Sequence, residues 1–172
     1  MSQDYFYLHM QEDDGGIASS PEDNEFEFLE DLSGYDELPF KFILSGGPFQ
    51  DYLLNDLSWP MFSEKFRKIA EPFLVNHPVQ WITAKVEDSE GREHISYVLK
   101  FNETYDVLDK NKTIFSANDF VVKACLSLDK IKELEIFPIP GSSFRIIVSK
   151  DVKEEIERNG ITGVYFSKVP VA

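Results

Sequence analysis

Apolar and polar residues alternate along several short stretches of the chain, and this alternation predicts β-strands. In residues 94–101, HISYVLKF, the apolar side chains of one face are Ile95, Tyr97, Leu99 and Phe101. Residues 79–88, VQWITAKVED, precede this stretch and are also typical of a strand, and SEGRE between them suits a hairpin loop. The two stretches together predict a β-hairpin with one buried face.

Further strands are predicted towards the C-terminus. Residues 120–131, FVVKACLSLDKI, alternate so that one face would carry Phe120, Val122, Ala124, Leu126 and Leu128, with Cys125 on the opposite face. Residues 134–149, LEIFPIPGSSFRIIVS, predict two strands around a Pro-Gly-Ser turn, and the side chains expected to point inward are Phe144, Ile146 and Val148. Residues 163–169, GVYFSKV, predict the last strand of the chain.

Two short stretches have the apolar spacing of a helix. The first predicts a helix over residues 64–71, with Ser63 as its N-cap and a proline that limits its length. The second lies in residues 149–160, where Asp151 has capping-box spacing to a glutamate three residues later. Gly160 follows an asparagine and suits the end of this helix.

The order of these elements predicts an α+β fold, with an antiparallel or mixed sheet and short helices packed against it. A chain of 172 residues can bury a core of its own, so we expect residues 1–172 to form a single domain. Two helix–strand units resemble each other weakly: a Ser-capped helix precedes a strand ending in Lys-Val, once after Ser63 and once after Ser149. Coincidence and duplication both explain this similarity.

The negative charge of the protein is concentrated at the N-terminal end of the chain. Residues 1–40 contain 12 Asp or Glu and no Lys or Arg, whereas the other 132 residues contain 19 acidic and 17 basic side chains. Almost all of the net charge of −14 therefore belongs to the first quarter of the chain. Such a field repels nucleic acids and anionic lipids and attracts basic protein surfaces. Solubility alone is the alternative explanation.

The stretch PEDNEFEFLEDLSGYDEL, residues 21–38, combines eight carboxylates with several apolar residues, which a plain solvated tail does not need. If its start is a strand, Glu25 and Glu27 share one face, and Phe26 and Phe28 share the other. The candidate partner-binding residues are therefore Glu25, Glu27, Glu30, Asp31, Asp36 and Glu37. Residues 11–24 are rich in Gly, Ser, Pro and Asp, and residues 1–24 are expected to be partly mobile.

The chain has no motif that predicts catalysis. His9, His77 and His94 occur singly, without the spacing of a metal site, and the acidic clusters lack the pattern of a calcium loop. We therefore expect no enzymatic activity, no cofactor and no metal. The single Cys125 excludes an internal disulfide and fits a reducing compartment, and no apolar span of 18 residues is present, so a cytoplasmic location is expected.

Residues 144–169, FRIIVSKDVKEEIERNGITGVYFSKV, resemble the myxobacterial-type immunity-protein domain of bacterial polymorphic toxin systems. In this sequence the residues that match its helix, turn and strand are Ser149, Val152, Ile156, Gly160, Ile161, Gly163, Val164 and Phe166. The mid-chain segments FSEKFRKIAEPF, VQWITAKV and ISYVLKFNETYDVLDKNKT are also similar, so the resemblance covers roughly residues 38–170. It implies a protein that protects its producer by binding a cognate toxin, with no catalytic residues.

Charge and resemblance together favour an immunity protein that neutralises a basic toxin through an acidic surface, because opposite charges accelerate association. The first alternative is a non-enzymatic adaptor whose acidic segment serves solubility. The second is an enzyme with an acidic metal site, which no ligand spacing supports. The oligomeric state is left open.

Overall fold

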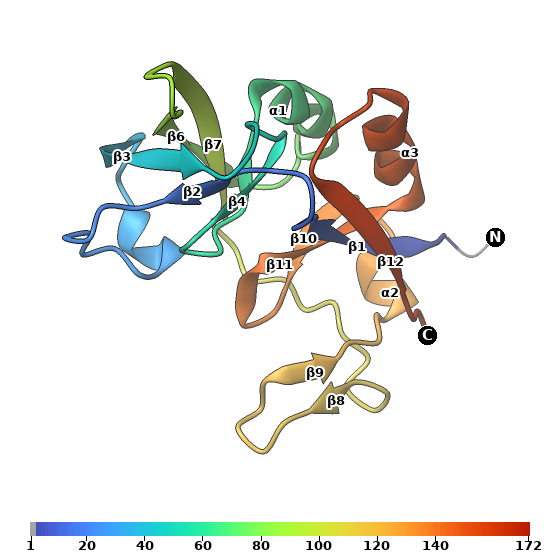
Figure 1. Ribbon diagram of the computed structural model, residues 1–172. Helices are drawn as coiled ribbons and strands as arrows, with labels where there is room; N and C mark the ends of the chain where they lie inside the picture. The colour runs from blue at the N-terminus through green and yellow to red at the C-terminus, as the bar shows by residue number, and fades with distance from the viewer. Residues whose placement is uncertain (1–2) are drawn as a thin grey trace.

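The computed structural model describes residues 3–172, which form two β-structures lying side by side (Figure 1). The first is a four-stranded antiparallel sheet in the order β10–β11–β1–β12. Its strands are β1 (Tyr5–Met10), β10 (Ile136–Ile139), β11 (Ser142–Ser149) and β12 (Val164–Val169). The strand nearest the N-terminus thus lies between two strands from the C-terminal end of the chain.

The second β-structure is a closed barrel in the order β2–β3–β6–β7–β5–β4. Its strands are β2 (Ile17–Ser19), β3 (Glu37–Ser45), β4 (Tyr52–Asn55), β5 (Met61–Phe62), β6 (Val79–Glu87) and β7 (Glu93–Phe101). The pairs β2–β4 and β3–β6 are parallel and the other pairs are antiparallel, so the barrel is mixed. The predicted α+β class with antiparallel or mixed sheets is confirmed.

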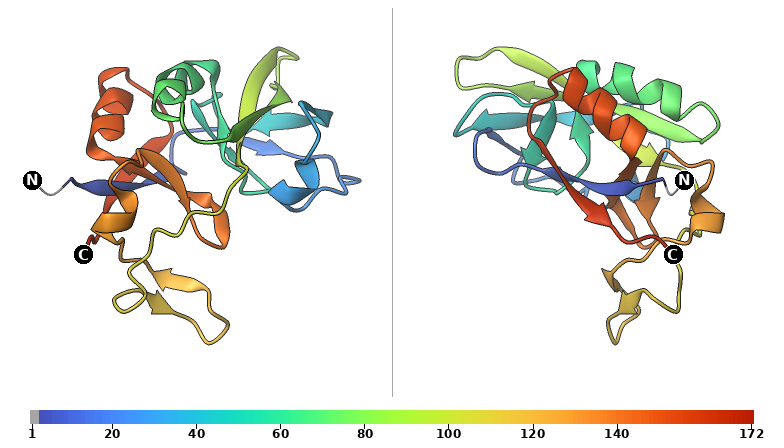
Figure 2. Two further views of the ribbon diagram at one scale, coloured as in Figure 1. Left: turned by 180° about the vertical axis from the view of Figure 1, so that it is seen from behind. Right: turned by 90° about the vertical axis from the view of Figure 1, so that its right-hand side faces the viewer.

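Short helices and one small hairpin complete the fold. The helices are η1 (Leu29–Leu32), α1 (Glu64–Ala70), η2 (Glu71–Phe73), α2 (Leu128–Ile131) and α3 (Lys150–Arg158). Helices α1 and α3 lie next to each other above the junction of barrel and sheet (Figures 1 and 2). The hairpin of β8 (Ile114–Phe115) and β9 (Val121–Lys123) projects from the body of the protein in every view (Figures 1 and 2).

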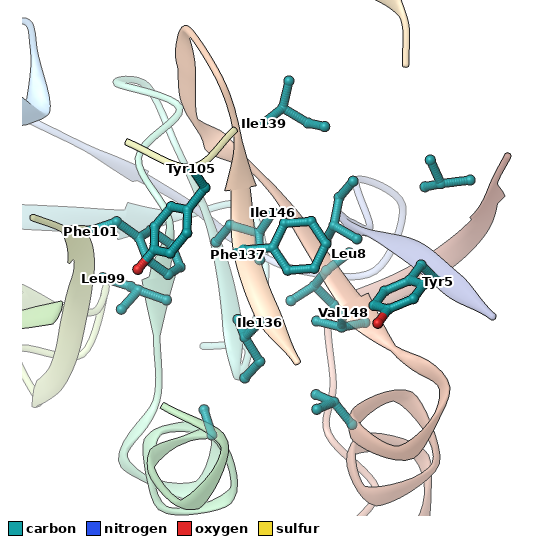
Figure 3. Close-up of a cluster of buried hydrophobic side chains, with 14 of the residues drawn as sticks. Tyr5, Leu8, Leu99, Phe101, Tyr105, Ile136, Phe137, Ile139, Ile146 and Val148 are labelled. Atoms are coloured by element: carbon teal, nitrogen blue, oxygen red, sulfur yellow. The ribbon is translucent and has the colours of Figure 1, made fainter. Parts of the chain in front are cut away.

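Two clusters of buried apolar side chains hold these parts together. One fills the barrel, and Phe42, Met61 and Ile82 are among its members. The other lies between the four-stranded sheet, the helices and the outer face of the barrel. In Figure 3, Leu99 and Phe101 of β7 point towards Phe137 and Ile146 of the sheet. Strand β7 therefore contributes to both clusters and joins barrel to sheet.

This double role explains why the predicted facing of β7 is partly wrong. Ile95, expected on the buried face, is exposed, whereas Ser96 and Val98, which alternation places on the opposite face, are buried. Val98 packs inside the barrel while Leu99 packs on its outside. A strand that is buried on both faces does not alternate between apolar and polar residues. A prediction that assumes one buried face therefore fails for it.

The strand predicted over residues 120–131 is also wrong. Only Val121–Lys123 form a strand, and α2 begins at Leu128. Phe120 and Val122, predicted to point inward, are exposed, and Cys125, predicted on the opposite face, is buried. The hairpin stands away from the body, so its alternating residues have no sheet to pack on.

The segment predicted to be partly mobile, residues 1–24, contributes β1 and β2. Tyr5 is fully buried, and its hydroxyl donates to the carbonyl oxygens of Ile131 and Leu134 at 3.0 and 3.3 Å. Residues 5–10 and 17–19 are therefore parts of the sheets, and mobility stays a prediction for the rest of this segment. Because β1 joins both ends of the chain in one sheet, we propose that residues 1–172 form a single domain.

The two helix–strand units share more geometry than their sequences indicate. Each helix follows an antiparallel strand pair, β4–β5 before α1 and β10–β11 before α3. The backbone N–H of the N-cap residue, Ser63 or Ser149, donates to the carbonyl oxygen of the residue that precedes the pair, Asp51 or Glu135, at 2.8 Å. Each serine hydroxyl also donates to the carboxylate of that same residue. Each serine oxygen accepts from the backbone N–H three residues later. The helix-capping geometry is thus repeated. Of the two residues that the sequence offered as a cap for the C-terminal helix, Ser149 caps α3 and Asp151 lies inside it.

This repeated cap predicts a matched loss of stability. Ser63→Ala and Ser149→Ala should each lower the free energy of unfolding by about 1–2 kcal/mol. Each substitution removes the N-cap hydrogen bond and the hydrogen bond to a partly buried carboxylate, that of Asp51 or Glu135. The melting temperature should fall by roughly 2–8 °C, as read by circular dichroism. The control is Ser127→Ala at the start of α2, where the side chain makes no cap bond, so a change below about 0.5 kcal/mol is expected. Equal losses in all three variants would contradict the assignment.

Candidate functional site

Residues 21–38, here called the acidic segment, are folded against the barrel. Leu29, Leu32 and Leu38 are buried in the barrel cluster, and Phe26 packs against the same cluster. The ring of Phe26 meets the ring of Tyr35 edge-on, with centroids 5.4 Å apart. Apolar residues therefore hold this segment in place in spite of its charge, as its composition predicted.

All six candidate partner-binding residues are exposed. Two of them have local partners: Glu37 pairs with Lys85 at 3.2 Å, and the Asp31 carboxylate accepts the N–H of Phe28 at 3.2 Å. For the others, Glu25, Glu27, Glu30 and Asp36, residues 3–172 provide no basic side chain within 4.0 Å. Their charges therefore remain available to an external partner.

The start of the acidic segment, which the sequence indicated as a possible strand, does not form one. Residues 24–28 are irregular, and η1 begins at Leu29. As a result Phe26 points into the barrel cluster while Phe28 is 63% exposed, so the two rings do not share a face. The Asn24 side chain sets this turn, because it accepts from the N–H of Phe26 and donates to the Phe26 carbonyl oxygen, both at 3.0 Å.

Phe28 lies at the edge of a cleft that we call the aromatic cleft. The cleft has a volume of about 610 Å³ and is bounded by the acidic segment, residues 100–105 at the end of β7 and beyond it, and the tip of the β10–β11 hairpin. Three exposed rings stand around it: Phe28, Phe120 (66% exposed) and Phe144 (48% exposed). The expectation that Phe144 points inward is therefore wrong.

The wall of the aromatic cleft contains buried polar atoms. The indole N–H of Trp59 and the hydroxyl of Tyr105 have no hydrogen-bond partner among the described residues. A buried donor left unpaired costs about 1–3 kcal/mol. Burial, with a smaller contribution from the charge of Glu103, raises the pKa of Tyr105 above its ordinary value, so its hydroxyl is protonated at neutral pH. In Figure 3 the Tyr105 ring lies beside Phe101 and Leu99.

The charge around the aromatic cleft is negative. Three carboxylates line it, Glu27, Glu30 and Glu103, against the single ammonium group of Lys100. Two of these carboxylates were among the six predicted residues, and the other four do not line the cleft. The cleft itself was not predicted, because its rings come from segments far apart in the chain. The sequence did single out two aromatic residues of its lining, Phe28 among the carboxylates and Trp59 before a proline in a loop-like stretch, but alternation assigned Phe120 to a core.

Residues 3–172 contain no group of three or more His, Cys, Asp or Glu side chains placed to hold a metal ion. Within the same residues, no helix combines the length and the apolar character needed to cross a bilayer. The geometry of the site thus consists of a folded acidic surface beside an aromatic cleft, which suits binding of a protein partner.

A model of an immunity protein family (Imm11) matches residues 6–171. The chain belongs to the Imm11 immunity protein family. The match includes all of the acidic segment and every segment that bounds the aromatic cleft. It confirms the resemblance seen in the C-terminal helix and strand and extends it to β1. No curated protein matches the chain. Membership of an immunity protein family implies that the partner of this Imm11 protein is a toxin.

Proposed function

We propose that this Imm11 protein neutralises a cognate toxin by binding it, without catalysis, through the acidic segment. The observation that carries the proposal is the anchoring of this segment: Leu29 and Leu32 are buried, while Glu25, Glu27 and Glu30 are exposed beside them. A rigid acidic surface loses little conformational entropy on binding, whereas a mobile acidic tail would lose much more. Membership of the family indicates that the partner is a toxin, and the acidic surface indicates that this toxin is positively charged.

The toxin that fits this surface is basic. Unpaired carboxylates in the acidic segment attract a basic surface over about 8–10 Å at moderate ionic strength and increase the association rate. A toxin that acts on nucleic acids needs such a basic surface for its own substrate. An acidic inhibitor that covers this surface would block the substrate directly. The same charge disfavours nucleic acids and anionic membranes as partners, and we propose action in the cytoplasm.

Calorimetry with the toxin encoded by the adjacent gene tests this proposal. The two purified proteins should bind, and the dissociation constant should rise steeply between about 50 and 500 mM salt, because screening weakens the attraction of exposed charges. Co-expression of the Imm11 protein should also restore growth of cells that produce the toxin. Absence of binding at both salt concentrations would overturn the proposal. Salt-independent binding would mean that the acidic surface does not contribute to the complex. The acidic segment would then serve solubility, as the adaptor alternative assumes.

A further inference from the structure

The aromatic cleft has the composition of the centre of a protein interface rather than that of ordinary surface. Phe28, Phe120 and Phe144 present large apolar areas to solvent around one hollow. Exposed apolar groups gathered in one place mark interaction sites, whereas single exposed residues do not. Aromatic residues are also enriched among those that dominate binding energy.

None of the three rings belongs to either cluster of buried apolar side chains. Phe120 lies in the turn between β8 and β9, where Asp119 adopts a positive φ of 61° and the Ser116 side chain accepts the N–H of Phe120 at 3.2 Å. The hairpin carrying it also exposes Ile114 and Val122. Isolated two-stranded hairpins are marginally stable in water. A projecting hairpin that exposes apolar residues costs stability, which is consistent with a role in contacting another molecule.

The hairpin is nevertheless fixed to the sheet, because the guanidinium group of Arg145 in β11 donates to the carbonyl oxygen of Val121 at 2.8 Å. At the base of the hairpin, the Thr113 hydroxyl donates to the carbonyl oxygen of Cys125 at 3.1 Å. Arg145 follows Phe144 in β11, so one strand supports both the ring of Phe144 and the hairpin that carries Phe120. The two rings are therefore positioned before any partner arrives, which lowers the entropy cost of binding.

We propose that the aromatic cleft receives an apolar side chain of the toxin, flanked by basic residues, as the anchor of the complex. This inference rests on the proposed function and adds the place and chemistry of the contact. Glu27, Glu30 and Glu103 surround the apolar centre and match basic neighbours of the inserted side chain. An apolar centre within a charged rim is the arrangement found in specific protein interfaces. Trp59, whose buried indole N–H has no partner among the described residues, lies in the wall behind this apolar centre.

Single alanine variants test the anchor by titration calorimetry and surface plasmon resonance with the toxin of the adjacent gene. Phe120→Ala and Phe144→Ala should each raise the dissociation constant about 30-fold or more, mainly through faster dissociation. The loss should persist at 500 mM salt, since apolar contacts are not screened. The matched control is Tyr165→Ala, which removes an exposed ring of β12 outside the cleft and should change the constant less than about threefold.

Nuclear magnetic resonance gives an independent readout. The chain has two tryptophans, Trp59 and Trp81, so a ¹⁵N-labelled sample shows two indole N–H signals, which a Trp81→Phe variant assigns. Unlabelled toxin should shift the Trp59 signal, because Trp59 lines the cleft, and should leave the Trp81 signal nearly unchanged. Circular dichroism of each alanine variant establishes that the fold is intact.

The outcomes separate this inference from the proposed function. Wild-type affinity in Phe120→Ala and Phe144→Ala, with an unshifted Trp59 signal, would overturn the anchor while leaving toxin binding in place. Absence of binding by the wild-type protein would overturn both. Self-association of the free protein in sedimentation experiments, abolished by Phe120→Ala, would assign the cleft to a second copy of the chain and overturn its assignment to the toxin.

Discussion

Replacing Glu25, Glu27 and Glu30 by Gln and Asp36 by Asn is expected to slow toxin association about 10–100-fold at low salt. These four side chains are exposed and have no basic side chain of residues 3–172 within 4.0 Å, so their field extends into solvent. Electrostatic attraction of this kind acts mainly on the association rate, and dissociation should change far less. Stopped-flow fluorescence at about 20 and 500 mM salt would measure both rates, and the difference between variant and wild type should nearly vanish at the higher concentration.

The control for this experiment changes the net charge equally but elsewhere. Four amide substitutions outside the acidic segment serve this purpose: Glu64→Gln, Glu90→Gln, Asp129→Asn and Glu154→Gln. Each of these carboxylates already lies near a basic side chain, so its contribution to the distant field is smaller. If both variants associate equally slowly, total charge rather than the acidic segment governs the encounter, and the proposed docking surface is wrong.

Local sequence signals predicted the elements whose packing is one-sided. Helix α3 buries Val152 and Ile156 along one face and ends before Gly160, whose φ of 63° suits glycine. Helix α1 begins after Ser63 as its spacing indicated. In such elements the side chains that face the core repeat with the period of the element itself, and that period is readable without knowledge of the partners.

Elements that serve two environments were not predictable in the same way. Strand β7 contacts the inside of the barrel through Val98 and the second cluster through Leu99, so adjacent residues are both buried. Strand β1 was missed because its position between β11 and β12 depends on residues almost the whole chain away. Closure of the barrel by the parallel pair β2–β4 is likewise a long-range event.

The candidate site likewise has one part that was predictable from local sequence and one part that was not. The acidic segment is a local feature of composition, and its anchoring by buried leucines follows from the apolar residues interleaved with its charges. The aromatic cleft is a tertiary feature, since Phe28, Phe120 and Phe144 meet only after the barrel, the sheet and the β8–β9 hairpin have assembled. Alternation treats an apolar residue in a strand as a core residue, and for Phe120 and Phe144 that inference assigned exposed residues to the interior.

Leu32→Ala should have the largest effect on stability among the changes considered, because it removes the anchor of the acidic segment. The Leu32 side chain is fully buried in the barrel cluster, and truncation of a buried leucine costs about 2–5 kcal/mol. That cost is a large part of the total stability of a domain, so the urea midpoint should fall clearly. Loss of the anchor should also accelerate hydrogen exchange at Ser33 and Tyr35, whose N–H groups donate to the carbonyl oxygens of Glu30 and Leu32.

Ile43→Ala provides the matched comparison, since Ile43 is an aliphatic residue of the same barrel that is 53% exposed. Its loss should cost less than about 1 kcal/mol and leave exchange in the acidic segment unchanged. Toxin binding should follow the same order: weakened in Leu32→Ala even when the protein is folded, and retained in Ile43→Ala. Wild-type stability in Leu32→Ala, with Ser33 and Tyr35 already exchanging freely in the unaltered protein, would mean that the carboxylates are not presented by a folded surface. Electrostatic docking would then require ordering of the acidic segment at the moment of binding, with a correspondingly lower affinity.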